Sequence, residues 1–359
     1  MQEKSILISL IAAAVIASGF TAGCTQEKSD DYYAGKTVFV YVGRTPGSGA
    51  DIAVRSFVRF WQQHIPGEPT MVVKNVPGGG GSRVWNLGWE NDKEDALEIF
   101  FSPVSGIAVI VEQEGMRADL SQMPMVGALT SPNMTFARTD RLKAAEDLPS
   151  VKGLQFGGQA PAHRFNVLGR LTLDILGVEY TSVDGFRGSS DVFNAMRRKE
   201  VDIQTAPLNF YRFTVEPGVV KSGEVIPLWY NPVIDKNGEV RPLEAAGDIP
   251  SFFDFYESVK GKSPEGELFE MYKWLLPNVN GIVYAALMPP QTSDEPLQIL
   301  RESFISATQD ENYRTEELKM FGFHLPVVDS EQGAEIFSNM ANAPESVRSF
   351  LRQYIQESR

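Results

Sequence analysis

Apolar residues along the chain alternate between short runs typical of buried strands and spaced patterns typical of helices. Residues 38–42 are five consecutive apolar residues of mostly β-branched or aromatic type, which predict a strand buried on both faces. After the glycine-rich residues 43–49, apolar side chains recur at helical spacing at Val54, Phe57, Val58, Trp61 and Ile65. The mature chain is therefore expected to begin with a strand, a tight turn and a helix.

A second copy of this arrangement follows at once. Residues 71–74 predict a strand, residues 75–81 a turn with four consecutive glycines, and Ser82 begins a helix. In both copies, free backbone N–H groups and the positive end of a helix dipole would meet at the carboxyl edge of the sheet. One such turn alone would favour a purely structural role, but two in tandem favour a binding site for an anion.

Neither turn carries a nucleotide-binding fingerprint. A dinucleotide turn starting at Gly47 would need a glycine where Ile52 stands, and one starting at Gly78 would need it where Arg83 stands. The sequence therefore predicts no nucleotide cofactor, and no other cofactor is expected.

The remaining pattern predicts strands alternating with helices, which indicates a parallel, doubly wound α/β sheet with its ligand site at the strands' carboxyl ends. Strands 125–129 and 134–137 are interpreted as the first crossing into a second lobe, and the return crossing is expected near Gly281. Ser189 is expected to cap a helix. Further strands are predicted at 97–102, 154–158, 202–205, 225–230 and 282–288, and helices that pack on the first lobe at 313–321, 331–340 and 345–355.

A third strand-to-helix turn, residues 159–164, follows the strand at 154–158 and is expected to face the first lobe. Pro161 suits a first helical turn, and Gly177 marks the end of the helix. His163 is the histidine most suited to ligand contact, although a histidine at a helix start packs or points to solvent at least as often. Arg164 has the same two interpretations.

The two tandem turns resemble the paired signature of the substrate-binding proteins of tripartite tricarboxylate transporters. Pro46-Gly47-Ser48-Gly49 with Asp51 is similar to the Pro-Gly-Gly-x-x-Asp turn of that family. Asn75-x-Pro77 followed by four glycines is similar to its Asn-x-Pro-Gly-x-Gly-Gly turn. The likeness extends along nearly the whole mature chain and is most specific in these two turns.

This resemblance implies a type II periplasmic-binding-protein-like α/β fold with two doubly wound lobes and an interlobe ligand cleft. Such proteins are extracytoplasmic receptors that capture a small organic carboxylate and deliver it to membrane permease subunits. The implied boundaries are residues 35–131 plus 281–359 for lobe 1 and 132–280 for lobe 2. A monomer in the bacterial periplasm or cell envelope is expected.

The chain departs from the family pattern at two informative places. Gln159-Ala160-Pro161 replaces the usual Gly-x-Gly-Ser, so a hydroxyl donor is missing while His163 is kept. Arg44 stands where the family often has an aromatic or apolar residue, and an arginine there can fork onto a carboxylate. The alternative, that Arg44 points out of the cleft and pairs with a surface acid, has about equal weight.

The predicted ligand contacts come from these turns and from polar or small residues at the ends of the other strands. Asp51 is excluded from this group, because an acid in the first turn more often complements the helix dipole. The predicted contacts are Arg44, Thr45, Gly47, Ser48, Gly49, Asn75, Gly78, Gly79, Gly80, Ser102, Ser105, Ser131, Gln159, Ala160, His163, Arg164, Arg187 and Ala206.

The N-terminus predicts a targeting segment. Residues 6–20 form an apolar run too short for a comfortable membrane span. The run ends in Thr21-Ala22-Gly23-Cys24, which resembles a bacterial lipobox, although leucine is usual at the first of these positions. An ordinary signal peptidase site beside an incidental cysteine is the alternative. We expect a signal peptide over 1–23, lipidation of Cys24, the only cysteine in the chain, and a tether over 24–34.

Charge and motif content narrow the function further. A net charge of −13 argues against nucleic-acid binding, which needs a basic face. His64, His163 and His324 lack metal-ligand spacing, and no nucleophile-elbow motif occurs. A receptor that presents its ligand to a sensor, and an enzyme acting on a carboxylate or phosphorylated substrate in the same cleft, are the alternatives to a transport receptor.

Overall fold

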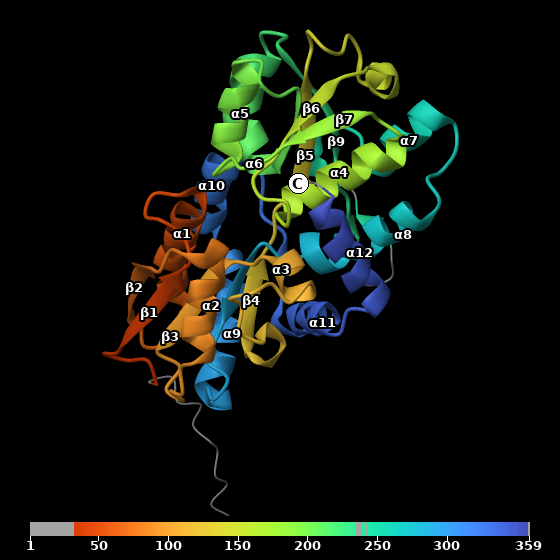
Figure 1. The fold of residues 1–359 in the computed structure, drawn as a ribbon. Coiled ribbons are helices and arrows are strands. Elements are labelled where there is room, and N and C mark those ends of the chain that lie inside the picture. The colour runs from red at the N-terminus through yellow and green to blue at the C-terminus, as the bar shows by residue number, and fades with distance from the viewer. Residues whose placement is uncertain (1–31, 235–238, 242, 358–359) are drawn as a thin grey trace, which may run out of the picture.

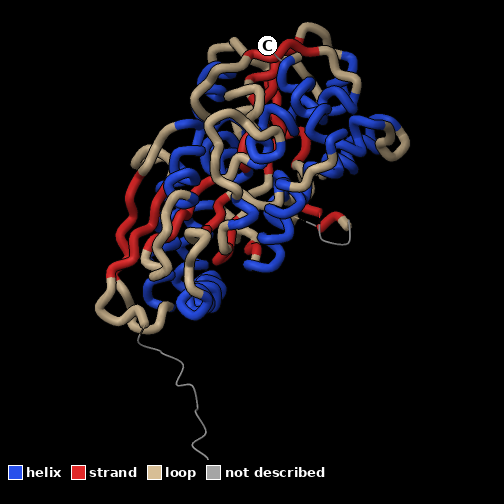
Figure 2. The backbone as a smooth tube through the Cα atoms, turned by 60° about the horizontal axis from the view of Figure 1, so that its bottom comes forward, coloured by secondary structure: helices blue, strands red, loops and turns tan. Residues whose placement is uncertain are grey.

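The protein is described by a computed structural model that covers residues 32–234, 239–241 and 243–357. The predicted signal peptide, Cys24 and most of the predicted tether lie outside the described residues. Two β-sheets with flanking helices form two lobes (Figure 1). The two groups of strands also stand apart when the molecule is viewed with its bottom turned forward (Figure 2).

The first lobe is built on a six-stranded sheet with the order β13-β4-β12-β3-β1-β2. Strand β1 pairs in parallel with β2 and β3, whereas β12 pairs antiparallel with β3 and β4. The expectation that all strands are parallel is therefore wrong for β12. The chain leaves the first lobe at the end of β4 and returns at the start of β12 beside it, so β12 runs antiparallel to β4. The strands are β1 (Thr37–Val42), β2 (Thr70–Asn75), β3 (Glu98–Pro103), β4 (Met125–Leu129), β12 (Tyr284–Leu287) and β13 (Val327–Val328).

The second lobe is built on a five-stranded sheet with the order β7-β6-β8-β5-β9. Strand β6 is parallel to β7 and β8, while the incoming strand β5 is antiparallel to β8 and β9. The strands are β5 (Asn133–Arg138), β6 (Leu154–Gly157), β7 (Tyr180–Val183), β8 (Ile203–Pro207) and β9 (Val225–Tyr230), and a separate hairpin consists of β10 (Val233–Ile234) and β11 (Val240–Arg241).

The two crossings between the lobes are hydrogen-bonded to each other. Thr130 donates its hydroxyl to the carbonyl of Asn280 at 2.9 Å, and Asn133 Nδ2 donates to Asn280 Oδ1 at 2.9 Å. The backbone N–H of Val283 donates to the carbonyl of Leu129 at 3.2 Å. Both segments are buried, so the connection between the lobes is a packed waist.

The helices cover both faces of the two sheets. Helix α4 ends at Gly177, which has a left-handed φ of +70°, as the sequence predicts. Ser189 begins α5 but does not cap it; Gly188 holds that position without a side-chain hydrogen bond. The helices are α1 (Gly49–His64), α2 (Ser82–Trp89), α3 (Gly106–Ile110), α4 (Arg164–Leu176), α5 (Ser189–Arg197), α6 (Leu208–Phe210), α7 (Phe252–Lys260), α8 (Glu267–Leu275), α9 (Asp294–Thr308), α10 (Glu311–Phe321), α11 (Ser330–Ala341) and α12 (Glu345–Gln356), with π-helical segments at Tyr211–Val220 and Leu276–Asn280.

Helix α12 contacts both lobes, although the sequence predicted packing on the first lobe alone (Figure 1). Arg348 in α12 donates to the carbonyl of Ile110 at the end of α3, at 2.9 Å. On the other side, Arg170 in α4 donates to the carbonyl of Tyr354 at 3.2 Å. The C-terminal helix therefore bridges the lobes.

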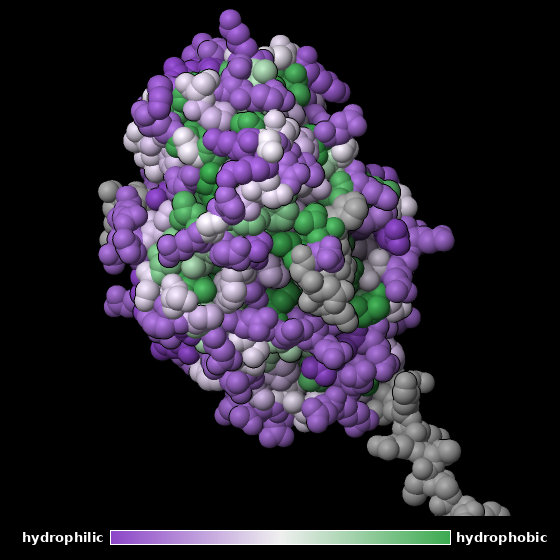
Figure 3. Space-filling model, turned by 90° about the vertical axis from the view of Figure 1, so that its right-hand side faces the viewer, coloured by the Kyte–Doolittle hydropathy of each residue, from purple (hydrophilic) through white to green (hydrophobic). Residues whose placement is uncertain are grey.

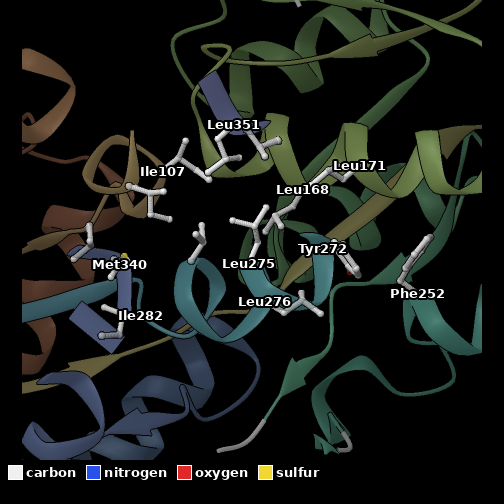
Figure 4. Packing of buried hydrophobic residues seen from close by; sticks show 14 of the residues in the cluster. Ile107, Leu168, Leu171, Phe252, Tyr272, Leu275, Leu276, Ile282, Met340 and Leu351 are labelled. Atoms are coloured by element: carbon white, nitrogen blue, oxygen red, sulfur yellow. The ribbon is translucent and has the colours of Figure 1, made fainter. Parts of the chain in front are cut away.

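Buried apolar side chains continue from one lobe into the other. Leu351 of α12 lies with Ile107 of α3 and Leu168 of α4 in one cluster (Figure 4). In β1, Val38, Val40 and Val42 are fully buried, but Phe39 and Tyr41 are only half-buried. The prediction that this strand is buried on both faces is therefore wrong.

The outer surface is largely hydrophilic on the face shown in Figure 3, with smaller apolar areas near its middle. Among the described residues, no helix combines the length and the apolar character that crossing a membrane would require.

Candidate ligand-binding site

The first glycine turn is fixed by hydrogen bonds to the start of α1. Ser48 caps this helix by accepting the backbone N–H of Asp51 at 3.3 Å. Asp51 is 2 % exposed, and its Oδ2 accepts the backbone N–H of Gly47 at 2.9 Å. Arg55 Nε and Asn75 Nδ2 also donate to this carboxylate, at 2.9 and 2.7 Å, so Asp51 ties the first turn to its neighbours.

Asn75 joins the first turn to the second. Its Nδ2 donates to Asp51 Oδ1 at 2.7 Å and to the carbonyl of Arg44 at 3.0 Å. Its Oδ1 accepts from Arg55 Nη2 at 2.8 Å. Both the Oδ1 and the Nδ2 of Asn75 are hydrogen-bonded, so its side chain fixes the two turns relative to each other.

The guanidinium of Arg44 lies against the second turn. A Cβ at Gly81, where φ is +112°, would lie only 2.7 Å from Nη1 of Arg44. Gly81 is therefore required both for its backbone conformation and for the close approach of Arg44. The same Nη1 donates to the carbonyl of Gly43 at 3.1 Å. These contacts direct Arg44 inward, beneath the turn that follows β2.

The third turn, between β6 and α4, is held by a buried amide. The backbone N–H of Gln159 donates to Asn166 Oδ1 at 2.8 Å, and Asn166 Nδ2 donates to Asp184 Oδ1 at 2.6 Å. A Cβ at Gly158 would lie 2.0 Å from Asn166 Nδ2, so only glycine fits there. This network fixes the path of the backbone that leads to His163.

His163 caps α4 through its ring. Its Nδ1 accepts the backbone N–H of Phe165 at 3.3 Å, so the neutral ring carries its proton on Nε2. Burial lowers the pKa of His163 to about 3, and the positive charges of Arg164 and Arg44 add to this effect. His163 is therefore a neutral hydrogen-bond donor at physiological pH.

Arg164 is the first residue of α4 and is 8 % exposed. Its Nη1 is buried and makes no hydrogen bond to any described residue. Burial lowers the pKa of Arg164 to about 10, which leaves the guanidinium charged at neutral pH. A buried charged donor without a partner is costly, and it is the group in this region most suited to bind an anion.

Tyr284 completes the cluster from the first lobe. It begins β12, opposite Pro103 in β3 and Leu129 in β4. Burial raises the pKa of its hydroxyl, against the opposing charges of Arg164 and Arg44, so the hydroxyl is neutral. The sequence analysis missed this residue. The antiparallel return of β12, which brings Tyr284 to the carboxyl edge of the sheet, could have indicated it.

A cavity of about 540 Å³ lies between the second glycine turn, the third turn and α12. The first lobe contributes the second glycine turn, the end of β3 and the residues in and after α3, while the second lobe contributes the turn before α4. The lining residues are Gly79, Gly81, Ser82, Trp85, Pro103, Ser105, Ala108, Val111, Glu112, Gln113, Glu114, Met116, Ala160, Pro161, Ala162, His163, Arg352, Ile355 and Gln356.

The structure brings some of the predicted contacts to this place. Gly79, Ser105, Ala160 and His163 line the cavity, and Arg44 and Arg164 act electrostatically on His163. Gly78 and Gly80 lie in the second glycine turn, and Gly80 is part of its short 3-10 helix Gly79–Gly81. Gln159 lies in the third turn.

Other predicted contacts lie elsewhere. Ser102 is fully buried and its hydroxyl accepts the backbone N–H of Gly43 at 2.9 Å. Ser131 lies in the buried crossing between the lobes, and Ala206 is buried within β8. The side chain of Arg187 is 92 % exposed and pairs with Asp191 at 3.1 Å. Four more positions, Thr45, Gly47, Ser48 and Gly49, belong to the partly or fully exposed first turn.

Three lining residues of α12, Arg352, Ile355 and Gln356, were not predicted. No local signal marks them, because a C-terminal amphipathic helix does not reveal which neighbours it will meet. Among the described residues, no group of three or more histidine, cysteine, aspartate or glutamate side chains could hold a metal ion.

No protein-family model matches the sequence, and no curated protein matches it. Solved structures do match. A TctC solute binding protein from Polaromonas superposes with a TM-score of 0.62 and 13% identity, over 90% of this chain and 99% of that chain. MatC from Rhodopseudomonas palustris with bound malate gives 0.57 and 14%, over 89% and 99%. An R. palustris protein with adipate gives 0.62 and 13%, over 90% and 97%.

These similarities confirm the predicted fold class, a two-lobed α/β fold of the type II periplasmic binding proteins. They also agree with the resemblance carried by the two glycine turns. At such low sequence identity, the similarity establishes the fold and nothing more.

Proposed function

We propose that the protein is an extracytoplasmic solute-binding receptor that captures a small organic carboxylate between its lobes and delivers it to the permease of a tripartite transporter. The observation that carries the proposal is the buried guanidinium of Arg164, whose Nη1 makes no hydrogen bond to a described residue. It lies in the interlobe cluster with His163, which lines the cavity. An anion that binds there gains a charged donor that folding has already buried.

The similar solved structures support the class of ligand. One contains malate and another contains adipate, and both ligands are small carboxylates. The neutral His163 ring offers an Nε2 donor, and the second glycine turn offers the backbone N–H of Gly79 at the cavity wall. Each of these groups donates a hydrogen bond, as a carboxylate requires.

The proposal includes a location and a division of the chain. Residues 35–131 plus 281–359 would move as one lobe and residues 132–280 as the other. Lipidation of Cys24 would hold the receptor at the membrane beside its permease. Metabolic labelling with a fatty acid tests the anchor, because the label should be lost in the Cys24→Ala variant and retained in the wild type.

Calorimetric titration with a panel of mono-, di- and tricarboxylates tests the binding claim. We expect at least one acid to bind with a 1:1 stoichiometry, while its uncharged amide does not bind. The bound acid is then followed by NMR for a day. Consumption of the acid would favour an enzyme, and failure of every acid to bind would contradict the proposal.

Delivery is tested separately by transport. Vesicles that contain the permease subunits should accumulate the bound acid when the receptor is added and a gradient is present. A receptor that binds the acid without stimulating any uptake would favour the presentation of ligand to a sensor.

A further inference from the structure

The C-terminal helix α12 is attached to a different lobe at each of its two ends. Its first half is attached to the first lobe through Arg348, and its last turn is attached to the second lobe through Tyr354. Near the last turn, Arg352, Ile355 and Gln356 line the cavity. Positions 348 and 354 lie about 9 Å apart along a helix. Because a helix does not stretch, the two attachments together fix the separation of the lobes beside the cavity.

The attachment to the first lobe has several parts. The guanidinium of Arg348 donates to the carbonyls of Ile110 and Ala343, at 2.9 and 3.1 Å, and pairs with Glu112 at 2.7 Å. The chain itself adds to this hold, because α12 begins four residues after the end of α11, which packs against β4. The first half of α12 is therefore the fixed end of the helix.

Glu112 has an unusual backbone conformation that serves this attachment. Its φ is +54°, in the left-handed region where residues with a side chain are uncommon. It follows α3, and the next backbone N–H, of Gln113, donates to the carbonyl of Ala108 at 2.9 Å. Glycine would fit this helix end without strain, but it has no carboxylate to pair with Arg348 and Arg352, as Glu112 does at 2.7 and 3.2 Å. The side chain thus holds α12 at the cavity wall.

The attachment to the second lobe is concentrated at Tyr354, which is 6 % exposed. Arg170 donates to its carbonyl at 3.2 Å and lies over its ring, and the Tyr354 hydroxyl donates to Asp174. Both partners belong to α4, and the residue that caps α4, His163, lines the cavity. The last turn of α12 is therefore fastened to the helix that carries the second-lobe wall of the cavity.

We propose that the last turn of α12 is a latch, in which Tyr354 docks on Arg170 and Asp174 when the lobes close over a ligand and detaches when they open. This inference rests on the proposed receptor function and deepens it, because the latch sets how long a carboxylate is retained. Separation of the lobes beside the cavity has to break one of the two attachments. The second-lobe attachment breaks, because it is concentrated at one residue, whereas the first-lobe attachment combines several bonds with the chain itself.

Stopped-flow measurement of ligand exchange tests the latch. The probe is the member of a panel of mono-, di- and tricarboxylates that binds most tightly, with malate and adipate tested first. The Tyr354→Phe variant keeps the ring and loses the hydroxyl. Its dissociation rate constant should rise about 10-fold, the effect of one hydrogen bond that stabilises only the closed arrangement. Its association rate constant should change less than about twofold, because the ligand enters the open arrangement.

Matched variants assign the effect to the contact between Tyr354 and Asp174. Asp174→Asn keeps an acceptor for the hydroxyl and should leave the dissociation rate near the wild-type value, whereas Asp174→Ala should raise it as Tyr354→Phe does. The double variant Tyr354→Phe/Asp174→Ala should release the ligand no faster than the faster single variant, because both remove the same bond. Tyr256→Phe, a change at another buried tyrosine of the second lobe, is the control and should release the ligand at the wild-type rate.

Amide hydrogen exchange identifies the end of α12 that moves. Saturation with the probe should slow exchange at residues 354–357 and leave residues 348–351 unchanged, because only the last turn detaches in the open arrangement. Without ligand, Tyr354→Phe should exchange faster than the wild type at residues 354–357 and equally at residues 348–351.

Each further outcome decides against one claim. A lower unfolding free energy of Tyr354→Phe with an unchanged dissociation rate would make Tyr354 a structural residue and overturn the latch, while the receptor function stands. Equal protection of both ends of α12 with and without ligand would also overturn it. If no carboxylate binds, the proposed function fails. Identical exchange of ligand-free Tyr354→Phe and wild type at residues 354–357 would then overturn the latch independently.

Discussion

His163 is the residue of the site whose protonation state can be measured most directly. Its ring caps α4 through Nδ1, and the positive charges of Arg164 and Arg44 act on it. The protein thus prevents the one histidine in its site from becoming a third cation. It uses the ring as a neutral donor, and protonation of the ring would work against folding.

Acid should therefore destabilise the protein through His163. The folded-state pKa of about 3 lies below the ordinary value of 6.5, so the unfolded chain binds a proton between these values while the folded chain does not. Stability conferred by this group is complete above pH 6.5 and is lost as the pH falls. Between pH 7 and 4.5 this loss amounts to about 2–3 kcal/mol.

Urea unfolding at the two pH values checks this prediction. Asparagine caps helices well but cannot titrate. On acidification, the His163→Asn variant should therefore lose less stability than the wild type, and the difference should equal the loss attributed to His163. If wild type and variant lose equal stability on acidification, the ring is not held neutral by its surroundings.

The sequence predicted part of the site at the residue scale. His163 and Arg44 were singled out because one matches a family turn and the other departs from it. In the structure His163 lines the cavity and the charge of Arg44 acts on it. Whether each contacts ligand remains a prediction. Tyr284 was missed because its relevance depends on the direction of β12, which only the three-dimensional pairing defines.

At the scale of elements, the two glycine turns behave as one unit. Asn75 at the end of β2 is hydrogen-bonded to the backbone of Arg44 and to the side chain of Asp51 in α1. The conformation of the first turn is therefore held by hydrogen bonds from a residue of the second. A family signature that contains both turns makes physical sense for this reason.

Asn75→Ala should loosen both turns together. We expect a loss of about 1–3 kcal/mol of unfolding free energy, because the buried carboxylate of Asp51 and the carbonyl of Arg44 lose a donor. Affinity for the bound acid should fall as well, since Arg44 is no longer held. Chemical denaturation and calorimetry measure the two effects, with the exposed Asn312→Ala as the control. Normal affinity in a destabilised variant would contradict the link between Asn75 and the site.

The C-terminal helix α12 is the second element with a defined role. Arg170 donates to the Tyr354 carbonyl and lies 4.3 Å from the centre of the Tyr354 ring, and the Tyr354 hydroxyl donates to Asp174. Burial raises the pKa of Asp174, although the hydroxyl opposes this effect. These contacts attach α12 to the second lobe, beside the cavity that it lines.

Tyr354→Phe should weaken this attachment. Loss of the hydroxyl donor to a largely buried carboxyl group should cost about 1.5–3 kcal/mol of unfolding free energy at pH 7. Tyr256→Phe is a suitable control, because Tyr256 is also buried but makes no hydrogen bond through its hydroxyl to a described residue. Equal stabilities of the two variants would show that the Asp174 contact contributes nothing.

Elements were predicted well where the pattern of apolar residues is local. The end of α4 at Gly177 and the strands β4 and β5 agree with the structure. The expectation that Pro161 lies in the first helical turn is wrong, because the cap at His163 starts the helix only at Arg164. The parallel direction expected for all the strands is wrong, and the contact of α12 with the second lobe was not predicted. Both depend on which segments meet across the waist, and hydrophobic periodicity carries no information about such partners.

At the scale of the whole molecule, the lobes are joined by packed and hydrogen-bonded segments. Thr130 and Asn133 in one crossing bond to Asn280 in the other, and apolar clusters continue through the waist. A relative rotation of the lobes would have these segments as its hinge. A ligand that contacts the turns of both lobes would stabilise the closed arrangement.

The fold as a whole was predictable because two glycine turns identified a family whose architecture the structure shares. The convergence of Arg44, Arg164 and Tyr284 was not predictable, because they come from positions far apart in the chain and from different lobes. Only the three-dimensional arrangement of the strands and helices brings them near one another.

A crystal structure of the protein with its tightest-binding carboxylate tests the proposed function most directly. We expect the acid to lie between the lobes, with a carboxylate hydrogen-bonded to the Arg164 guanidinium. An acid bound to one lobe only, or bound without contact to Arg164, would contradict the proposal.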